Sequence, residues 1–461
     1  MCSCVKKGGL SPFFIDYMGK KVSLISLGCP KNQVDAEVLL GCLVQDGLIP
    51  VFSVGEADVV IVNTCAFIQE AVQESIEVIL EAAEVKKAGT AATLIVTGCL
   101  PQRYGKELVQ SMPEVDLWTG TGDFLQIPQW LRNGGPRQLI GKPRYLYDHH
   151  TPRIIVNTPH AAYVKIAEGC SHPCTFCLIP RLRGGYRSRE MDSIIHETDQ
   201  LVARGVVEVT LVAQDTTAYG VDRGEEYGLA RLLKALTKIT GLQWIRFLYA
   251  YPHPGNFPAS FLDMVTAQER ICPSFDIPLQ HIDDAILRRM GRRASEKEIR
   301  GLVYRIKRDY PRIHLRTTLM TGFPGEGEQE FGRLLDFVRE AEFTHLGVFT
   351  YSPEEGTKAS RMKGQVAAEL AKERAAQIME LQQGISWKRN TEMIGSMVPV
   401  LIDAMDEGPE GVLRGRTDFQ APEVDGVVHI KKGKANVGKI VTVKITQAMP
   451  YDLVGEIAEN S

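Results

Sequence analysis

The sequence lacks any long hydrophobic run. None of its 461 residues lies in an uninterrupted apolar stretch of the ~18 residues that suggest a membrane-spanning helix. Near the N-terminus the only apolar run is the short segment 13–15, without a cleavage site of small residues, so no secretory signal is predicted. We therefore expect a cytoplasmic protein that does not enter a membrane.

An excess of positive charge is also missing. Lys and Arg number 53 against 56 Asp and Glu, which gives a net charge of −3. The chain thus lacks the strongly basic footprint of a protein that coats nucleic acid. Apolar residues make up 44% and charged residues 24%, ordinary values that argue against a largely disordered chain. At roughly 100–200 residues per domain, the length predicts about three domains.

Ten cysteines are the main chemical feature of the chain. In a reducing compartment, clustered cysteines bind metals or take part in catalysis more often than they form disulfides. Cys42 and Cys272 stand alone in apolar surroundings and are predicted to be small buried hydrophobic side chains. Cys2 and Cys4 lie in an N-terminal extension, residues 1–20, and are not assigned a role, with a transient metal or redox pair as the alternative. Six candidate ligands remain: Cys29, Cys65, Cys99, Cys170, Cys174 and Cys177.

Residues 21–135 are predicted to form an α/β domain around a parallel sheet. A helical apolar pattern over 69–87 separates two of its strands. Because parallel strands present their carboxyl ends at one edge, the cysteines after the strands should meet there, although ordinary packing of buried cysteines is the alternative. The apolar runs and the cysteines that follow them are 22–27 before Cys29, 59–62 before Cys65, and 94–96 before Cys99.

A segment rich in Gly, Pro, Arg and His, residues 134–157, is interpreted as a linker to a second α/β region over 156–389. Helical patterns such as 191–203 and 282–306 separate its apolar runs. Six βα units favour a partial parallel barrel with its working face at the loops after the strands, and a doubly wound open sheet is the alternative. The six runs are 163–167, 207–213, 245–249, 275–277, 315–320 and 346–351.

The end of the chain changes character. A helix over 366–389 is predicted as a connector. After it, residues 390–457 show short β-type runs separated by Gly, Pro and Asp, as in a small OB-like β-barrel. The runs are 397–402, 427–430 and 440–445.

Cys170, Cys174 and Cys177 follow the first strand of the second region with C-x3-C-x2-C spacing. Three thiolates so close together can hold one small iron–sulfur cluster. A structural zinc site is the competing interpretation, but zinc needs a fourth ligand and the backbone would have to fold back tightly for His172 to supply it. Three cysteines leave one iron of a 4Fe–4S cluster open to a small molecule.

This motif, with Phe176 directly before its last cysteine, resembles the signature of the radical S-adenosylmethionine (SAM) enzymes. The resemblance implies that Cys170, Cys174 and Cys177 hold a 4Fe–4S cluster whose open iron binds SAM. It further implies that an electron from the cluster splits SAM and yields a 5′-deoxyadenosyl radical. Such chemistry belongs to the cofactor, while the protein positions it and excludes water.

The N-terminal strings resemble a narrower group, the radical SAM methylthiotransferases. Membership implies that Cys29, Cys65 and Cys99 hold a second 4Fe–4S cluster that carries the sulfur, and that residues 390–457 are a TRAM domain. The matching strings are Ser-Leu-Gly-Cys-Pro-Lys-Asn at 26–32, Val-Asn-Thr-Cys at 62–65, and Thr-Gly-Cys-Leu-Pro-Gln-Arg-Tyr at 97–104.

Further strings of this family end the predicted barrel strands, where a barrel places ligand contacts. We predict Phe176, Gln214, Gln280 and Gly322 as contacts of the cofactor, with His281 as either a contact or a core residue. Gly322 would let backbone approach an adenosine closely. The arginine-rich segment 181–189 could neutralise carboxylates, with a solvated loop as the alternative.

Members of the family that this sequence resembles act on one of two substrates. One is an adenosine of transfer RNA, and the other is the β-carbon of an aspartate of small-subunit ribosomal protein S-twelve. Two strings favour the ribosomal branch, Cys-Pro-Lys-Asn at 29–32 and Ala-Pro-Glu-Val-Asp-Gly at 421–426. The acidic residues Glu423 and Asp425 also suit a basic ribosomal protein better than RNA.

The implied reaction also needs an electron donor, a sulfur donor and a second SAM for the methyl group. The expected partner is ribosomal protein S-twelve or the small ribosomal subunit, with transfer RNA as the alternative. A metal-cluster protein that binds RNA or the ribosome through its C-terminal barrel is the non-enzyme alternative.

Overall fold

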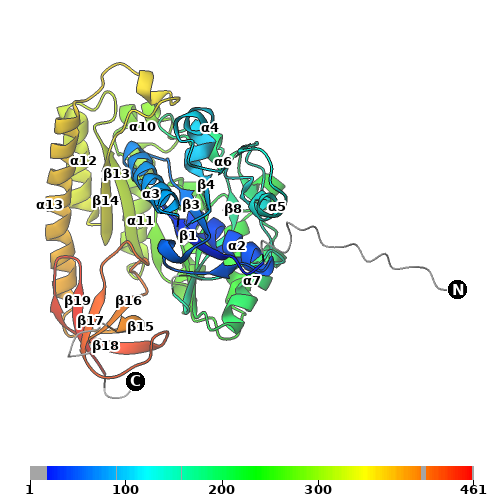
Figure 1. The fold of residues 1–461 in the computed structure, drawn as a ribbon. Helices are drawn as coiled ribbons and strands as arrows, with labels where there is room; N and C mark the ends of the chain where they lie inside the picture. The colour runs from blue at the N-terminus through cyan, green and yellow to red at the C-terminus, as the bar shows by residue number, and fades with distance from the viewer. Residues whose placement is uncertain (1–17, 90, 157, 406–411, 459–461) are drawn as a thin grey trace. The chain divides into compact units, whose positions relative to one another are not determined.

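The computed structural model describes residues 18–89, 91–156, 158–405 and 412–458 (Figure 1). The chain divides into two compact units. Unit 1 comprises residues 1–156 together with the short segment 178–185, and unit 2 comprises 157–177 and 186–461. Cys2 and Cys4 lie outside the described residues. No helix in the described ranges is long and apolar enough to cross a membrane.

Unit 1 contains one parallel sheet, as predicted. Apolar and β-branched residues form its central strands because both faces of the sheet are covered, and all six residues of Val59–Thr64 are buried. The strands in spatial order are β2 (Ile49–Pro50), β1 (Lys21–Ser26), β3 (Val59–Thr64), β4 (Thr93–Gly98), β5 (Leu117–Thr119) and β6 (Gln138–Leu139).

The helices of unit 1 alternate with these strands. The predicted helix at 69–87 is confirmed as α3 (Gln69–Lys87), whose buried positions Val72, Ile79 and Ala83 join the apolar core beside the sheet. The remaining helices are α2 (Pro30–Gln45), α4 (Cys99–Ser111), α5 (Ile127–Asn133) and α6 (Ile179–Arg183), with short 3-10 turns η1 (Val54–Glu56) and η2 (Phe124–Gln126).

The predicted linker at 134–157 was partly wrong. Its residues 138 and 139 form β6, which pairs in parallel with β5 at Trp118 and Thr119. This edge strand has only two residues, too few to show an alternating apolar pattern in the sequence. Its regular conformation comes from backbone hydrogen bonds to the neighbouring strand.

Unit 2 begins with six parallel strands in two groups of three, with pairing orders β11-β10-β7 and β12-β13-β14. A single parallel bridge from Ile245 to Ile271 joins strand β11 to the segment before β12. This series is the predicted partial barrel. Its strands are β7 (Ala161–Lys165), β10 (Glu208–Val212), β11 (Trp244–Phe247), β12 (Ser274–Asp276), β13 (His314–Thr321) and β14 (His345–Thr350), and the short strands β8 (Ala167–Glu168) and β9 (Arg187–Ser188) pair separately.

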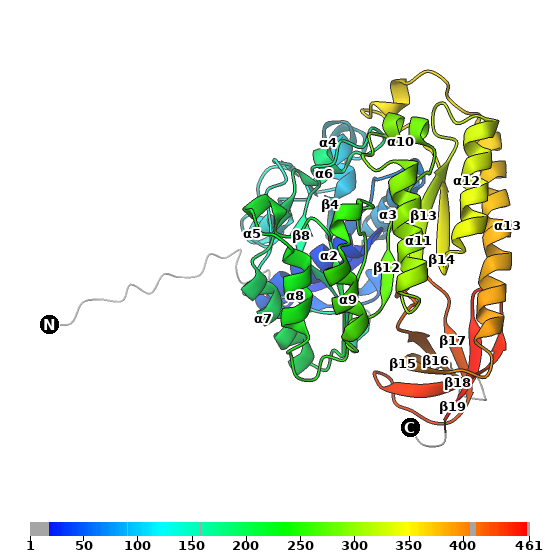
Figure 2. The ribbon, with the colours of Figure 1, turned by 180° about the vertical axis from the view of Figure 1, so that it is seen from behind.

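Helices follow the barrel strands, and Figure 2 shows several of them side by side in front of the strands. The helix predicted at 191–203 is confirmed as α7 (Met191–Ala203). The others are α8 (Gly228–Leu236), α9 (Ala259–Ala267), α10 (Asp284–Met290), α11 (Glu296–Asp309) and α12 (Glu328–Ala341), with 3-10 turns η3 (Val221–Arg223), η4 (Pro254–Asn256) and η5 (Ala359–Arg361).

The single helix predicted over 282–306 is wrong, because the chain breaks there into α10 and α11. Gly291 ends α10 in the left-handed conformation at φ 74°. Ser295 then starts α11 with a capping box in which Ser295 and Glu298 satisfy each other's backbone N–H groups. The apolar spacing continues across this break, so periodicity alone did not reveal it.

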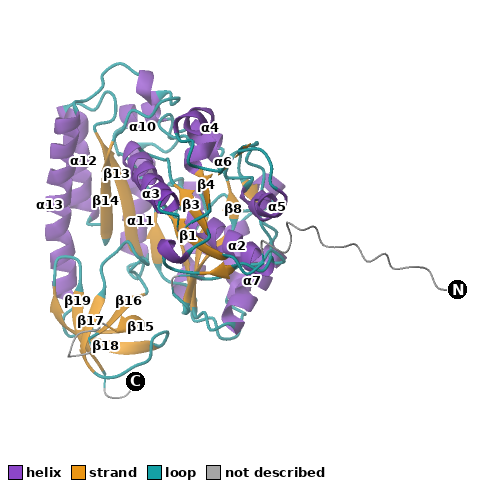
Figure 3. Ribbon diagram, in the orientation of Figure 1, coloured by secondary structure: helices purple, strands orange, loops and turns teal. Residues whose placement is uncertain are grey.

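The connector helix is confirmed as α13 (Ala368–Glu392), which runs to the small C-terminal barrel (Figure 3). That barrel is closed, in the order β15-β16-β17-β19-β18. Two of its strands were not predicted, β16 and β19, because Gly and charged residues interrupt their apolar pattern. The strands are β15 (Met397–Met405), β16 (Leu413–Thr417), β17 (Val428–Lys432), β18 (Ile440–Ala448) and β19 (Leu453–Ile457).

Buried ion pairs join the two barrels within unit 2. Glu208 on β10 accepts from Arg246 on β11 and from Arg416 on β16, with an Arg416 Nη2 to Glu208 Oε2 distance of 2.7 Å. Asp425 pairs with Arg316 on β13 at 3.1 Å, and its side chain is only 5% exposed. The acidic stretch at 423–425 therefore does not present Asp425 to a basic partner, which corrects the charge argument from the sequence.

Candidate functional site

Three cysteines follow three neighbouring strands of unit 1. Strands β1, β3 and β4 end at Ser26, Thr64 and Gly98, and their order in the sheet places β3 between the other two. Cys29 stands three residues after β1, whereas Cys65 and Cys99 follow their strands directly. The predicted convergence at the carboxyl edge of the sheet is therefore present.

Gly28 shows how closely these turns approach. Its φ is 89°, and a Cβ added to it would lie 2.6 Å from Cys65 Cβ and 2.8 Å from Cys65 Sγ. Only glycine gives both the backbone conformation and the space for the Cys65 side chain. The strand-end loops that carry Cys29 and Cys65 are therefore in direct contact.

Side-chain amides and hydroxyls tie the same loops together. Asn32 donates to the carbonyl of Leu27 at 2.7 Å, and Asn63 donates to the carbonyl of Asn32 at 2.8 Å. Thr64 donates to the carbonyl of Thr97 at 2.6 Å, which links β3 to β4. These bonds fix the loops before any metal binds.

The three thiols influence one another electrostatically. Burial, together with the smaller effects of the neighbouring Cys99 and Cys29, raises the pKa of Cys65 to about 12. Burial also raises the pKa of Cys99. Burial opposes ionisation of Cys29 too, yet the cations Lys31 and Arg183 bring the pKa of its thiol below the ordinary value. One thiolate is thus favoured, and the others need a bound metal to lose their protons.

These residues fit an iron–sulfur cluster better than a single ion. In the described part of the chain, no group of three or more His, Cys, Asp or Glu side chains is arranged to hold one metal ion. A cluster of several irons and sulfides is larger than an ion and holds its ligands further apart. Three mutually close thiols with two nearby cations suit such an anionic group.

The second triad lies in unit 2, in the loop that follows β8. Burial, together with a smaller effect of Cys174, raises the pKa of Cys170 to about 11. The backbone N–H of Cys177 donates to the carbonyl of Cys174 at 3.3 Å, so the loop turns between these two cysteines. As in unit 1, the donor set consists of three thiols and fits an iron–sulfur cluster.

His172, the residue that zinc would have required, faces other partners. Its Nε2 lies 2.7 Å from the Asp215 carboxylate, and its ring stacks on Tyr251 with the centroids 3.8 Å apart. Arg292 covers the same Tyr251 ring at 4.7 Å. His172 therefore supports the cysteine loop through its contacts with Asp215 and Tyr251.

Gln214 lies beside the strand that leads into the cysteine loop. Its Nε2 donates to Glu168 Oε1 at 2.8 Å, and Glu168 also pairs with the buried Lys165 at 2.6 Å. The Oε1 of Gln214 is buried without a hydrogen-bond partner. An orphaned buried acceptor is what a polar ligand would satisfy, and the role of Gln214 as a cofactor contact stays a prediction.

Phe176 contacts core side chains, and the backbone of Gln280 is bonded to a neighbouring strand. The Phe176 ring meets Phe323 edge to face at 6.2 Å and packs on the cluster that includes Met290. Gln280 has a strained φ of 71°, and its backbone bridges to β13 through Thr318 and Met320. Their predicted cofactor contacts stay predictions.

Gly322 has a packing reason of its own. Its φ is 75°, and an added Cβ would lie 2.3 Å from the Cβ of Ala371 on α13. His281 is fully buried, and its Nδ1 accepts from the backbone N–H of Asp283 at 3.0 Å. Its Nε2 is buried without a hydrogen-bond partner, 3.4 Å from Glu326 Oε2, so His281 is not a fully satisfied core histidine and its role as a contact stays a prediction.

The arginine-rich segment is not a solvated loop. Arg189 is buried and pairs with Glu197 at 2.6 Å in unit 2. Arg183 is buried in unit 1, where its Nη1 lies 2.5 Å from the Asp35 carboxylate and its Nη2 lies 3.6 Å from Cys99 Sγ. Only Arg181 of this pattern is well exposed. The contacts of Arg183 and Asp35 with the cysteine site were not predicted, because no motif connects residues so far apart in sequence.

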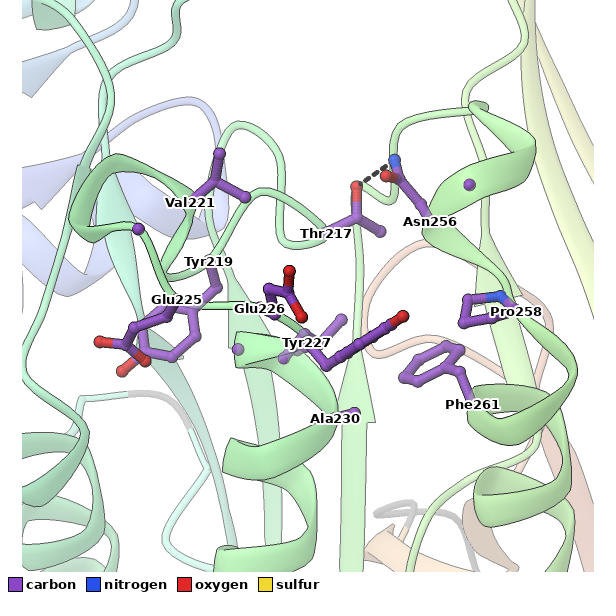
Figure 4. Close-up of a pocket in the computed structure, with 14 residues that line it drawn as sticks. Thr217, Tyr219, Val221, Glu225, Glu226, Tyr227, Ala230, Asn256, Pro258 and Phe261 are labelled. Atoms are coloured by element: carbon purple, nitrogen blue, oxygen red, sulfur yellow. Dashed lines mark hydrogen bonds between the residues drawn. The ribbon is translucent and has the colours of Figure 1, made fainter.

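A cavity of about 450 Å³ opens next to the ends of β10 and β11 (Figure 4). Tyr227 and Phe261 line it from the starts of α8 and α9, and Thr217 accepts a hydrogen bond from Asn256 at 2.9 Å across its rim. Thr217 belongs to the string that contains Gln214. None of the six candidate cysteines lines this cavity.

Three family models match the chain. Residues 21–120 match the model described as "Uncharacterized protein family UPF0004". Residues 164–338 match the radical SAM superfamily, and residues 394–458 match the TRAM domain.

Full-length relatives are similar to this chain. The "Ribosomal protein uS12 methylthiotransferase RimO" of Syntrophotalea carbinolica is 48% identical over 446 residues, which are 96% of this chain and 98% of that protein. The protein of the same name from Geotalea uraniireducens is 47% identical over 442 residues, covering 95% and 98%.

Among solved structures, the radical SAM methyltransferase TsrM from Kitasatospora setae has a similar fold. It superposes with a TM-score of 0.54 at 16% identity and covers 72% of this chain and 73% of its own. This likeness concerns the fold alone. Together, the near full-length identity and the radical SAM match make the chain a radical SAM methylthiotransferase, an enzyme that uses SAM and an iron–sulfur cluster, and it belongs to the ribosomal protein uS12 methylthiotransferase RimO family.

Proposed function

We propose that this enzyme inserts a methylthio group at the β-carbon of an aspartate of ribosomal protein uS12, using two 4Fe–4S clusters. The observation that carries the proposal is the presence of two cysteine triads, one after three neighbouring parallel strands of unit 1 and one in the loop that follows β8 in unit 2. The substrate follows from the name that the relatives carry. A ribosomal substrate assigns the reaction to the cytoplasm.

Cys170, Cys174 and Cys177 would hold the cluster that binds SAM. When bound, cluster and SAM supply a carbon-centred radical strong enough to remove hydrogen from an unactivated carbon. An aspartate β-C–H is too weakly acidic for a side-chain base, and general acid–base catalysis contributes only about 10²–10⁴-fold. His172, Asp215 and Tyr251 hold the cysteine loop in place by a hydrogen bond and ring stacking.

Cys29, Cys65 and Cys99 would hold the auxiliary cluster, which carries the sulfur to be inserted. Gly28 gives Cys65 its space, and Asn32 and Asn63 fix the loops. Lys31 and Arg183 favour the thiolate that an iron needs as ligand. An electron donor and a sulfur donor complete the reaction from outside the chain.

Separate replacement of the two triads tests the assignment. Anaerobically purified wild-type enzyme should contain about eight irons, and each triple Cys→Ala variant about four. Replacing Cys170, Cys174 and Cys177 should abolish 5′-deoxyadenosine formation. Replacing Cys29, Cys65 and Cys99 should leave SAM cleavage and remove the methylthio product. Undiminished 5′-deoxyadenosine in the first variant, or colourless protein with stoichiometric zinc, would contradict the proposal.

Mass spectrometry identifies the substrate. Cells with and without the enzyme should differ in the mass of ribosomal protein uS12 by one methylthio group, while transfer RNA nucleosides stay unchanged. A difference in a transfer RNA adenosine instead would assign the enzyme to the other substrate class.

A further inference from the structure

Arg183 reaches the N-terminal cysteine triad from a different part of the chain. It is the last residue of α6, which begins two residues after Cys177 and belongs to unit 1. Its side chain is only 3% exposed. A guanidinium cannot lose its proton in a protein, so this is a permanent positive charge inside a compact unit.

The guanidinium is held in place by two partners and lies against a third. Asp35 accepts from Nη1 at 2.5 Å, Asn32 accepts from Nη2 at 3.0 Å, and Cys99 Sγ lies 3.6 Å from the same Nη2. Asn32 in turn donates to the backbone of the loop that carries Cys29. The planar fork of arginine satisfies all three at once, which a lysine ammonium on a flexible stem cannot do with the same geometry.

The charge of Arg183 lies beside the triad. Its Nη2 lies 3.6 Å from Cys99 Sγ and donates to Asn32, which is bonded in turn to the loop that carries Cys29. Three thiolates make an anionic site, and one-electron reduction or attachment of a sulfide adds further negative charge. A buried cation close to the sulfur ligands stabilises these more negative forms.

We propose that Arg183 is a positioning residue of the auxiliary cluster: it donates to Cys99 Sγ and supplies the fixed positive charge that raises the reduction potential of the cluster. The inference rests on the proposed function, since it requires Cys29, Cys65 and Cys99 to hold a cluster. The segment that carries Arg183 begins directly after Cys177 in the sequence and belongs to unit 1.

Full-length enzyme with Cys170, Cys174 and Cys177 replaced by Ala isolates the auxiliary cluster for measurement. Redox titration followed by electron paramagnetic resonance gives its midpoint potential, and iron analysis gives its occupancy. Arg183→Met should lower the potential, with at least a tenfold change in the ratio of oxidised to reduced cluster, about 59 mV for one electron. Arg183→Lys, which keeps the charge but not the fork, should fall between wild type and Arg183→Met.

Asp35→Asn should shift the midpoint potential of the cluster in the opposite direction. It keeps the Arg183 cation and removes the nearby carboxylate, so the potential should rise. General damage to the site would move both variants in the same direction. If Arg183→Met leaves a buried Asp35 that prevents folding, the double variant Arg183→Met/Asp35→Asn removes the pair together and should still lie below Asp35→Asn.

Arg153→Lys is the matched control, because Arg153 is also buried in unit 1 and pairs with Glu37 at 2.6 Å. It should leave the potential unchanged. Fully loaded Arg183→Met with the wild-type potential would overturn the role of Arg183 and leave the cluster assignment intact. Absence of iron from the background chain would instead overturn the proposed function itself.

Discussion

At the scale of single residues, the cysteines alone do not make the site. The loops that carry them must also approach one another closely. The cysteines are visible in the sequence, but the residues that make their convergence possible are a glycine, two asparagines and a distant arginine. Of the two isolated cysteines, Cys272 is 1% exposed beside Trp244 and Leu401, as predicted, whereas Cys42 is only half-buried. Position in the fold, not residue type, separates ligands from core cysteines.

Gly28→Ala should remove the auxiliary cluster selectively. A Cβ at this position would overlap Cys65, and the positive φ adds about 1–2 kcal/mol of strain. Iron analysis of anaerobically purified enzyme should fall from about eight toward four per chain, with SAM cleavage retained. Gly89→Ala is the control, since Gly89 has a similar φ of 81° but open space around it. Equal iron loss in both variants would point to backbone strain instead of contact with Cys65.

At the scale of secondary structure, breaks matter as much as the elements themselves. Three predicted strands in unit 1 and six in unit 2 are present, because runs of β-branched and apolar residues in a sheet covered on both faces give a strong signal. The break between α10 and α11 gave only a weak signal in the sequence. Gly291 is needed there because a Cβ would lie 2.5 Å from the carbonyl oxygen of Pro173, inside the C-x3-C-x2-C loop.

Gly291→Ala should therefore damage the SAM-cleaving site. The new methyl group pushes on Pro173, between ligands Cys170 and Cys174, and small displacements of reacting groups can cost up to about 100-fold in rate. Formation of 5′-deoxyadenosine should fall about 10–100-fold. Gly301→Ala within α11 has open space and should preserve the rate while stabilising the helix by up to about 1 kcal/mol. An unimpaired rate in Gly291→Ala would show that the loop tolerates the shift.

At the scale of the whole molecule, residues far apart in sequence form the contacts between the six-stranded region and the C-terminal barrel of unit 2. His314 on β13 stacks on Phe419 with the ring centroids 4.3 Å apart. Burial, together with the smaller effects of the neighbouring Arg389 and His345, lowers the pKa of His314 to about 3. The folded protein thus keeps this imidazole neutral where the unfolded chain binds a proton.

Stability should therefore fall as the pH drops below about 6.5, the ordinary pKa of histidine, because only the unfolded chain takes up the proton until about pH 3. Between pH 7 and pH 5, the free energy of unfolding of wild type should drop by about 1–2 kcal/mol more than that of His314→Phe. Denaturant unfolding at both pH values measures the difference. His196→Gln on the exposed side of α7 is the control and should retain the wild-type slope. Parallel pH profiles of wild type and His314→Phe would contradict this role.

By itself, the sequence determined the order of the three regions, the parallel strands, and which six cysteines are candidates, because these depend on local periodicity and spacing. Only the tertiary structure decided which side chains surround them. Arg183 lies far along the chain from Asp35 and Cys99, and Asp425, acidic in the sequence, is paired with Arg316 instead of facing a partner. Burial and charge pairing arise when separate strands and loops come together, and no local pattern records them.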